Sequence, residues 1–215
     1  MLFLYRVLIN IILFVSPLII IYRILINKEH PKRFCEKIGV FSKKRKKGKL
    51  IWFHGASVGE ILSIIPLVEK LEKKNNIKQI LITSNTLSSS KLMLKYKLKK
   101  TLHQFFPIDA KYLVNKFLNH WNPSLAVFIE SEIWPHMMFG IKKRNIPLIL
   151  INGRITKKTF KNWKKFNFLS KNIFKLFNLT LAQSKTSENF LKIVGANNVK
   201  RVGNLKFCEA KTQIS

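Results

Sequence analysis

The stretch 49-KLIWFHGASVGEILSIIPLVEKLEKKNNIKQILITS-84 is the most informative part of the sequence about the fold. It contains two short apolar runs, 49–54 and 78–84, and between them a segment, 58–74, in which Ile, Val and Leu recur at helical spacing. Short apolar runs are typical of buried strands, whereas a period of 3.6 residues predicts an amphipathic helix. A strand, a helix and a second strand in this order predict a βαβ unit with two parallel strands.

The same alternation continues to the end of the chain. Further strands are predicted at 101–107, 123–130, 147–153, 179–184 and 200–204, and further helices at 88–100, 110–120, 132–144, 156–177 and 185–195. The chain is therefore predicted to be an α/β protein, with a Rossmann-like parallel sheet that right-handed crossovers flank with helices on both faces. Ligands of such sheets bind at the carboxyl ends of the strands, so polar residues at those positions are candidates for a site.

The N-terminus has a different character. Residues 2–26 are apolar except for two arginines, one asparagine and one serine, and about 20 apolar residues in a helix cross a bilayer core. A helix that is apolar on all sides favours lipid over a protein core, and no small-residue cleavage site follows to indicate a secretory signal. Residues 1–28 are predicted to be a single membrane anchor and 29–48 a basic juxtamembrane linker, which places the rest of the chain in the cytoplasm.

The composition is strongly basic, with 40 Lys and Arg against 10 Asp and Glu and a net charge of +30. This charge indicates either an anionic partner, such as a membrane surface, or a compositional bias towards lysine, and both interpretations stay open. The lysines are spread along the whole chain and no nucleic-acid-binding motif is present, so no nucleic-acid partner is expected. Cys35 and Cys208 form no C-x-x-C pair, and no histidine spacing predicts a metal site.

The segment Ser57-Val58-Gly59-Glu60 follows the first strand and allows three interpretations. In a capping box, Ser57 accepts a hydrogen bond from the amide of Glu60, and Glu60 reaches back to the amide of Ser57. Gly55 and Gly59 would then relieve crowding in the turn. A phosphate-binding loop is disfavoured, because the Walker lysine is absent and a carboxylate repels phosphate. A catalytic carboxylate is the third interpretation, and this motif alone favours the cap.

A second polar cluster follows the strand 123–130. Glu130 ends that strand, where the ligand crevice is expected, and Glu132 is predicted to open the next helix, whose dipole favours a carboxylate. Trp134 either packs at the start of the helix or forms a wall for a sugar or lipid. Asn152 and Arg154 follow the next strand, and the guanidinium pairs with a carboxylate at this rim, with an anionic substrate, or with a surface group.

Taken in chain order, WFHGASVGE, TSNT, FFPID, FIESEIWP, LINGRIT, AQS and VGNLKF resemble the successive motifs of the 3-deoxy-D-manno-octulosonic acid (Kdo) transferase family. The resemblance covers essentially the whole chain, and the combination of motifs is far more specific than any one of them. It implies a GT-B glycosyltransferase, in which an N-terminal Rossmann-like domain binds the lipid acceptor and a C-terminal domain binds CMP-Kdo. This chain resembles the N-terminal half. Residues 49–207 are the expected acceptor-binding domain and 208–215 the expected start of the interdomain crossing, with the donor domain absent from the sequence.

The resemblance also implies roles for the carboxylates. Glu60 matches the general base that deprotonates the acceptor hydroxyl, and Glu130 matches a second essential carboxylate. The other candidates are expected to bind substrate: Ser57, Gly59, Trp134, Asn152 and Arg154. No metal and no cofactor other than the donor substrate CMP-Kdo is implied.

The implied partners are a lipid A precursor, anionic lipids at the cytoplasmic face of the inner membrane, and a separate donor-binding domain. Two alternatives remain, a non-catalytic membrane-bound module that binds anionic lipid or a partner, and a truncated inactive copy.

Overall fold

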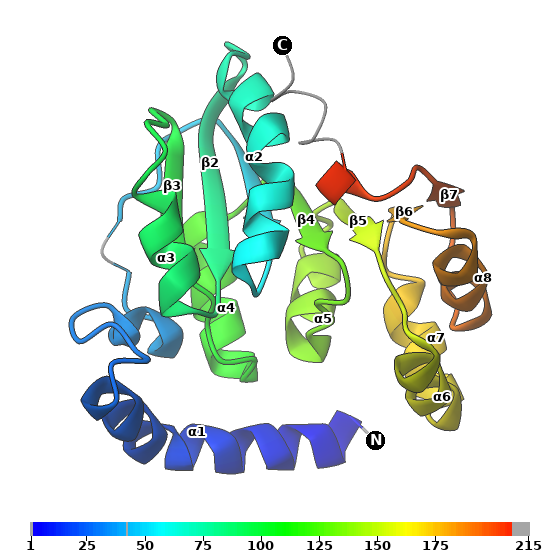
Figure 1. Ribbon diagram of the computed structural model, residues 1–215. Coiled ribbons are helices and arrows are strands. Elements are labelled where there is room, and N and C mark those ends of the chain that lie inside the picture. Colours follow the sequence, from blue (N-terminus) through cyan, green and yellow to red (C-terminus); the bar gives the residue numbers. More distant parts are fainter. Residues whose placement is uncertain (1, 42, 208–215) are drawn as a thin grey trace.

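The computed structural model describes residues 2–41 and 43–207 of the chain. Within these residues, seven parallel strands form one sheet in the order β3-β2-β1-β4-β5-β6-β7 (Figure 1). The strands are β1 (Lys49–His54), β2 (Ile77–Ser84), β3 (Thr101–Phe105), β4 (Leu125–Ile129), β5 (Leu148–Gly153), β6 (Leu179–Ala182) and β7 (Val199–Arg201). The strand order reverses between β1 and β4, and a doubly wound sheet opens its ligand crevice at such a point.

Helices cover both faces of this sheet. They are α2 (Val58–Glu72), α3 (Leu87–Met93), α4 (Lys111–Trp121), α5 (Pro135–Lys143), α6 (Lys157–Lys165), α7 (Asn167–Phe174) and α8 (Lys185–Ile193). Successive residues of β1 point to opposite faces: Trp52 belongs to the buried cluster beneath α4, α5 and α7, and Phe53 to the cluster beneath α2. The predicted fold class, a Rossmann-like parallel sheet flanked by helices, is confirmed.

Two predicted helices differ from the structure. The helix predicted over 88–100 is wrong in its second half, because α3 ends at Met93. The carboxylate of Glu72 accepts hydrogen bonds from the amides of Lys99 and Lys100, at 2.9 and 2.8 Å, and this holds the chain extended as it enters β3. The helix predicted from residue 132 begins only at Pro135, so Glu132 lies in the turn before it.

The N-terminal helix α1 (Leu2–Leu25) lies alongside the sheet domain, at the bottom of Figure 1. Among the described residues, Phe3–Leu25 is the one helix long and apolar enough to cross a membrane. Its inner side is docked: the Tyr5 hydroxyl donates to Asp109 over 2.7 Å, and Ile9 packs against Ala110. Length and composition thus agree with the predicted anchor, while the side of the membrane stays a prediction.

The following segment, expected as a basic linker, contains a short 3-10 helix, η1 (Phe34–Ile38). Glu36 of this helix is buried and forms an ion pair with Arg33 at 2.8 Å. Its other oxygen accepts the amide of Phe105 at 2.8 Å, at the end of β3. The segment is therefore held against the sheet by a buried charge that is fully hydrogen-bonded.

Candidate active site

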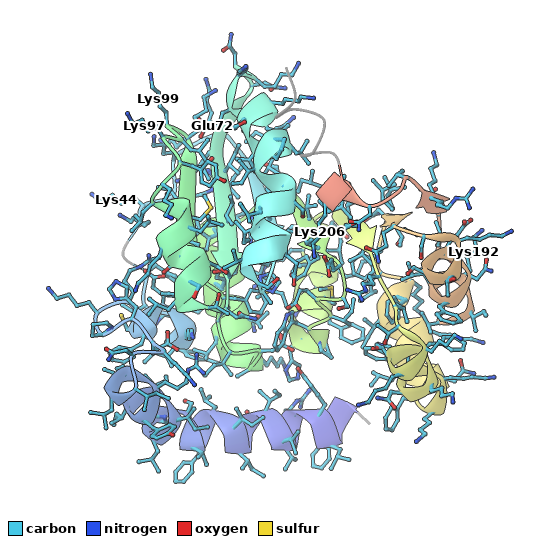
Figure 2. All side chains as sticks on the ribbon, in the orientation of Figure 1. Lys44, Glu72, Lys97, Lys99, Lys192 and Lys206 are labelled. Atoms are coloured by element: carbon cyan, nitrogen blue, oxygen red, sulfur yellow. The ribbon has the colours of Figure 1, made fainter. Side chains whose placement is uncertain are left out.

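Four polar side chains meet where β1, β4 and β5 end. Glu60 lies in the first turn of α2, Glu130 directly follows β4, and Asn152 lies near the end of β5. The fourth, Lys206, comes from the 3-10 helix η2 (Leu205–Phe207) and is labelled in Figure 2 beside α2 and β4. The residues Glu60 and Glu130 are each 9% exposed, and Asn152 is fully buried.

Two neighbouring residues hold the Glu60 carboxylate. The Ser57 hydroxyl donates to Oε1 over 2.8 Å, and the amide of Ala56 donates to Oε2 over 2.8 Å. The Ser57 Oγ also accepts the amide of Glu60 at 3.3 Å, so the first half of the predicted capping box is confirmed. The second half is wrong. The Ser57 hydroxyl occupies Oε1, and the remaining oxygen reaches the amide of Ala56 instead of that of Ser57.

Burial raises the pKa of Glu60 above its ordinary value. The hydrogen bonds from Ser57 and Ala56 oppose this shift, while the negative charges of Glu132 and Glu130 add to it. A carboxylate has about four acceptor positions, and these two hydrogen bonds leave the others open. A fixed carboxylate with a raised pKa and open lone pairs is suited to accept a proton from a hydroxyl.

Glu130 is paired with Lys206, whose Nζ lies 2.7 Å from Oε1. The Asn152 side chain donates to the same oxygen at 3.4 Å and accepts the amide of Leu205 at 3.2 Å. Asn152 therefore links Glu130 to the segment that carries Lys206. The sequence interpretation missed Lys206. The one feature of the sequence that could have indicated it is its position in the motif VGNLKF, near the last predicted strand.

Trp134 contacts the same region through Glu132. Its indole N–H donates to Glu132 Oε2 over 3.0 Å, and His54 Nε2 lies 3.4 Å from that oxygen. His54 is fully buried beside Phe106, and burial lowers its pKa, while the neighbouring Glu132 carboxylate acts in the opposite direction. Glu132 is thus placed by its contacts with an indole and an imidazole, not by the helix dipole that the sequence suggested.

The structure separates the two glycines of the turn. A Cβ on Gly55 would lie 2.9 Å from Cδ1 of Ile129, so crowding requires glycine there. A Cβ on Gly59 would meet its nearest atom, the Nζ of Lys206, at an ordinary 3.6 Å. The expectation that Gly59 also relieves crowding is therefore wrong, and its bare backbone simply faces Lys206.

Arg154 is exposed at the same rim. Its amide donates to the carbonyl of Glu130 over 3.3 Å, which places it beside the carboxylates. Within 2–41 and 43–207, its guanidinium makes no hydrogen bond or ion pair, so the predicted pairing with a rim carboxylate is not formed. The described residues also contain no group of three or more His, Cys, Asp or Glu side chains placed to hold a metal ion.

A model of the family described as "3-Deoxy-D-manno-octulosonic-acid transferase (kdotransferase)" matches residues 32–209. The chain belongs to this Kdo transferase family. A 3-deoxy-D-manno-octulosonic acid transferase of Rickettsia bellii (strain RML369-C) is 35% identical over 197 residues, which are 92% of this chain and 47% of that protein. A probable mitochondrial Kdo transferase of Arabidopsis thaliana is 37% identical over 152 residues, 69% of this chain and 34% of that protein. The chain thus spans less than half the length of these relatives.

Solved structures support the fold alone. A UDP-GlcNAc 2-epimerase from Neisseria meningitidis aligns with 78% of this chain and 51% of its own, with a TM-score of 0.53 at 14% identity. A second UDP-N-acetylglucosamine 2-epimerase aligns over 79% of this chain and 52% of its own, with a TM-score of 0.56 at 10% identity. The Kdo transferase domain therefore resembles one half of these larger folds.

Proposed function

We propose that this chain is the acceptor-binding half of a glycosyltransferase that transfers Kdo from CMP-Kdo to a lipid A precursor in lipopolysaccharide biosynthesis. Family membership supports the activity. The observation that carries the proposal is Glu60, a nearly buried carboxylate with a raised pKa at the end of β1, held by two hydrogen bonds.

In this proposal Glu60 takes the proton of the acceptor hydroxyl. At the same time the hydroxyl oxygen forms a bond to the Kdo sugar, and the bond between Kdo and CMP breaks. Ser57 and Ala56 keep the carboxylate in position for that transfer. The ammonium group of Lys206 offsets the charge of Glu130, so the two buried carboxylates can stand close together.

The other candidates have supporting roles. Asn152 positions Glu130 and Lys206, while the exposed guanidinium of Arg154 and the ring of Trp134 are proposed to contact the anionic acceptor. A donor-binding domain is the proposed partner across the cleft, and no metal or cofactor is proposed. The helix α1 is proposed to attach the domain to the cytoplasmic face of the inner membrane, where the +30 charge favours anionic lipids.

The test supplies a donor domain. Residues 1–207 replace the matching segment of the Rickettsia bellii relative, and transfer of Kdo from CMP-Kdo to a lipid A precursor is measured. Glu60→Gln should lower kcat at least about 100-fold, the scale of a lost general base. Glu69→Gln, on an exposed turn of the same helix, is the matched control and should keep the parental rate.

Two results would overturn this assignment. If Glu60→Gln still transfers Kdo, Glu60 is not the general base. If its melting temperature also falls, Glu60 acts only as a helix cap. A parental chimera that binds acceptor vesicles and transfers nothing favours the non-catalytic membrane module.

A further inference from the structure

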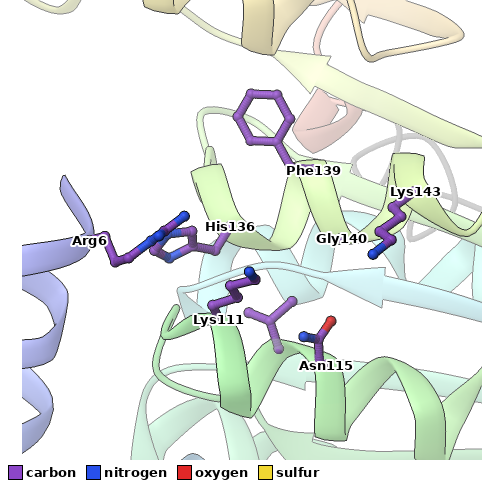
Figure 3. Close-up of a pocket in the computed structure, with 8 residues that line it drawn as sticks. Arg6, Lys111, Asn115, His136, Phe139, Gly140 and Lys143 are labelled. Carbon is purple, nitrogen blue, oxygen red and sulfur yellow. The ribbon is translucent and has the colours of Figure 1, made fainter. Parts of the chain in front are cut away.

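A cavity of about 190 Å³ lies between α1, α4 and α5. Its polar lining comes from three helices (Figure 3): Arg6 of α1, Lys111 and Asn115 of α4, and His136 and Lys143 of α5. Phe139 and Val114 also line the cavity. None of these residues belongs to the carboxylate cluster, so this is a second site.

The charge of this cavity is uncompensated. Across the described residues, Arg6, Lys111 and Lys143 make no hydrogen bond or ion pair, and no lining residue is acidic. The carboxylate of Asp109, which contacts His136, already accepts hydrogen bonds from the Tyr5 hydroxyl and from the amides that begin α5. Three cationic side chains, all solvent-exposed, line one cavity that has no acidic lining residue, and this favours binding of an anion with several oxygens.

His136 adds a second sign of a missing ligand. Its Nδ1 lies 2.5 Å from the carbonyl oxygen of Asp109, which fixes the ring. Its Nε2 is buried and has no hydrogen-bond partner among the described residues. Buried polar atoms are nearly always satisfied by protein, water or ligand, so this nitrogen indicates a polar group at the cavity.

The surroundings of the cavity are apolar. A second hollow of about 380 Å³ shares Arg6, Lys111 and Asn115 with it and is also lined by Leu13 of α1 and Tyr112 of α4. On its outer side α1 exposes large apolar side chains, with Leu8 56% and Phe14 86% exposed. A cationic pocket that opens onto an apolar helix matches an amphiphile with an anionic head.

We propose that this cavity binds the phosphate of an anionic membrane glycerophospholipid, whose acyl chains lie along α1. Arg6, Lys111 and Lys143 hold the phosphate oxygens, and the docked helix forms one wall of the site. The lipid would thereby fix α1 against the domain at the height of the headgroups. The inference rests on the proposed membrane association and is independent of the transfer reaction.

The test measures binding of dihexanoyl phosphatidylglycerol to the full chain in dodecyl maltoside, by native mass spectrometry and by the shift in melting temperature. Dihexanoyl phosphatidylcholine and inorganic phosphate are the comparison ligands. The double variant Lys111→Gln/Lys143→Gln should bind phosphatidylglycerol about tenfold or more weakly, as expected for two lost lysines near an anionic lipid. The matched control, Lys142→Gln/Lys161→Gln, loses the same charge outside the cavity and should bind as the wild type does.

Three results would overturn the proposal. Equal weakening in the control shows diffuse electrostatic attraction, equal binding of phosphatidylcholine shows no selection of the anionic head, and equal affinity for inorganic phosphate shows a free-anion site. If the double variant fails to fold, the neighbouring single variants Lys143→Gln and Lys142→Gln give the same comparison. Unchanged lipid binding in Glu60→Gln separates this site from the catalytic proposal.

Discussion

The ion pair between Glu130 and Lys206 should stabilise the folded protein by holding η2 against the end of β4. The Nζ–Oε1 distance is 2.7 Å, and the side chains are 11% and 42% exposed, respectively. At an effective dielectric constant of about 20, two charges at this distance attract by about 6 kcal/mol. Water screens the exposed lysine and ordering its side chain costs entropy, so the net coupling should be about 1–2 kcal/mol.

The assay is a double-mutant cycle. Urea unfolding at pH 7 is measured in one detergent for the wild type, Lys206→Met, Glu130→Gln and the double variant. The control cycle uses Glu188 and Lys192, which lie 2.6 Å apart on the surface of α8 and should couple less because solvent screens them. A Glu130–Lys206 coupling no larger than the control value would show that partial burial does not strengthen this ion pair.

Loss of Lys206 also has a chemical consequence. Without the ammonium group, the charge of Glu130 acts on Glu60 uncompensated, and a like charge raises a carboxyl pKa further. In the active chimera, Lys206→Met should therefore move the acid limb of the kcat/KM profile to higher pH. An acid limb that stays in place would show that Lys206 does not tune the base.

Three other expectations test the packing and the base. Gly55→Ala should cost about 1–3 kcal/mol by overpacking against Ile129, and a melting curve identical to the wild type would contradict it. Tyr5→Phe removes the 2.7 Å hydrogen bond to buried Asp109, so hydrogen exchange of 2–25 should speed up; equal protection would exclude docking by this bond. As the pH is lowered, the rate of transfer should begin to fall at a pH above 4.5, the ordinary pKa of the carboxyl. The reason is that the base must be ionised and burial raises the pKa of Glu60. An acid limb at or below that value would contradict the assignment.

The sheet was predictable because its strands are apolar on both faces. The run 123–130 was predicted as a strand and β4 occupies Leu125–Ile129, while 147–153 corresponds to β5 at Leu148–Gly153. Once the strands are placed, parallel topology brings their carboxyl ends together, and this alone puts Glu60 and Glu130 at one rim. The positions of Glu60 and Glu130 could therefore be predicted from the local sequence pattern, without knowledge of any long-range contact.

What the sequence could not show depends on contacts between distant segments. Lys206 reaches Glu130 across 76 positions of the chain, and no local periodicity encodes that approach. The docking of α1 is similar. A helix that is apolar on all sides presents no preferred face, so Tyr5 and Ile9 turn inwards only because Asp109 and Ala110 lie opposite them.

The backbone at the two strand ends points to function more strongly than the side-chain pattern does. Glu130 and Asn152 both have left-handed φ values, 57° and 52°. Asparagine adopts this conformation readily, but for glutamate it costs about 1–2 kcal/mol. Glycine or asparagine would fit the turn after β4 with less strain, so local folding gives no reason for a glutamate there. The strain is offset by the hydrogen bond from the amide of Arg154 to the Glu130 carbonyl and by the ion pair with Lys206. A strained, nearly buried carboxylate that neighbouring contacts hold near Glu60, the proposed base, is the arrangement expected where chemistry, and not stability, selects the residue.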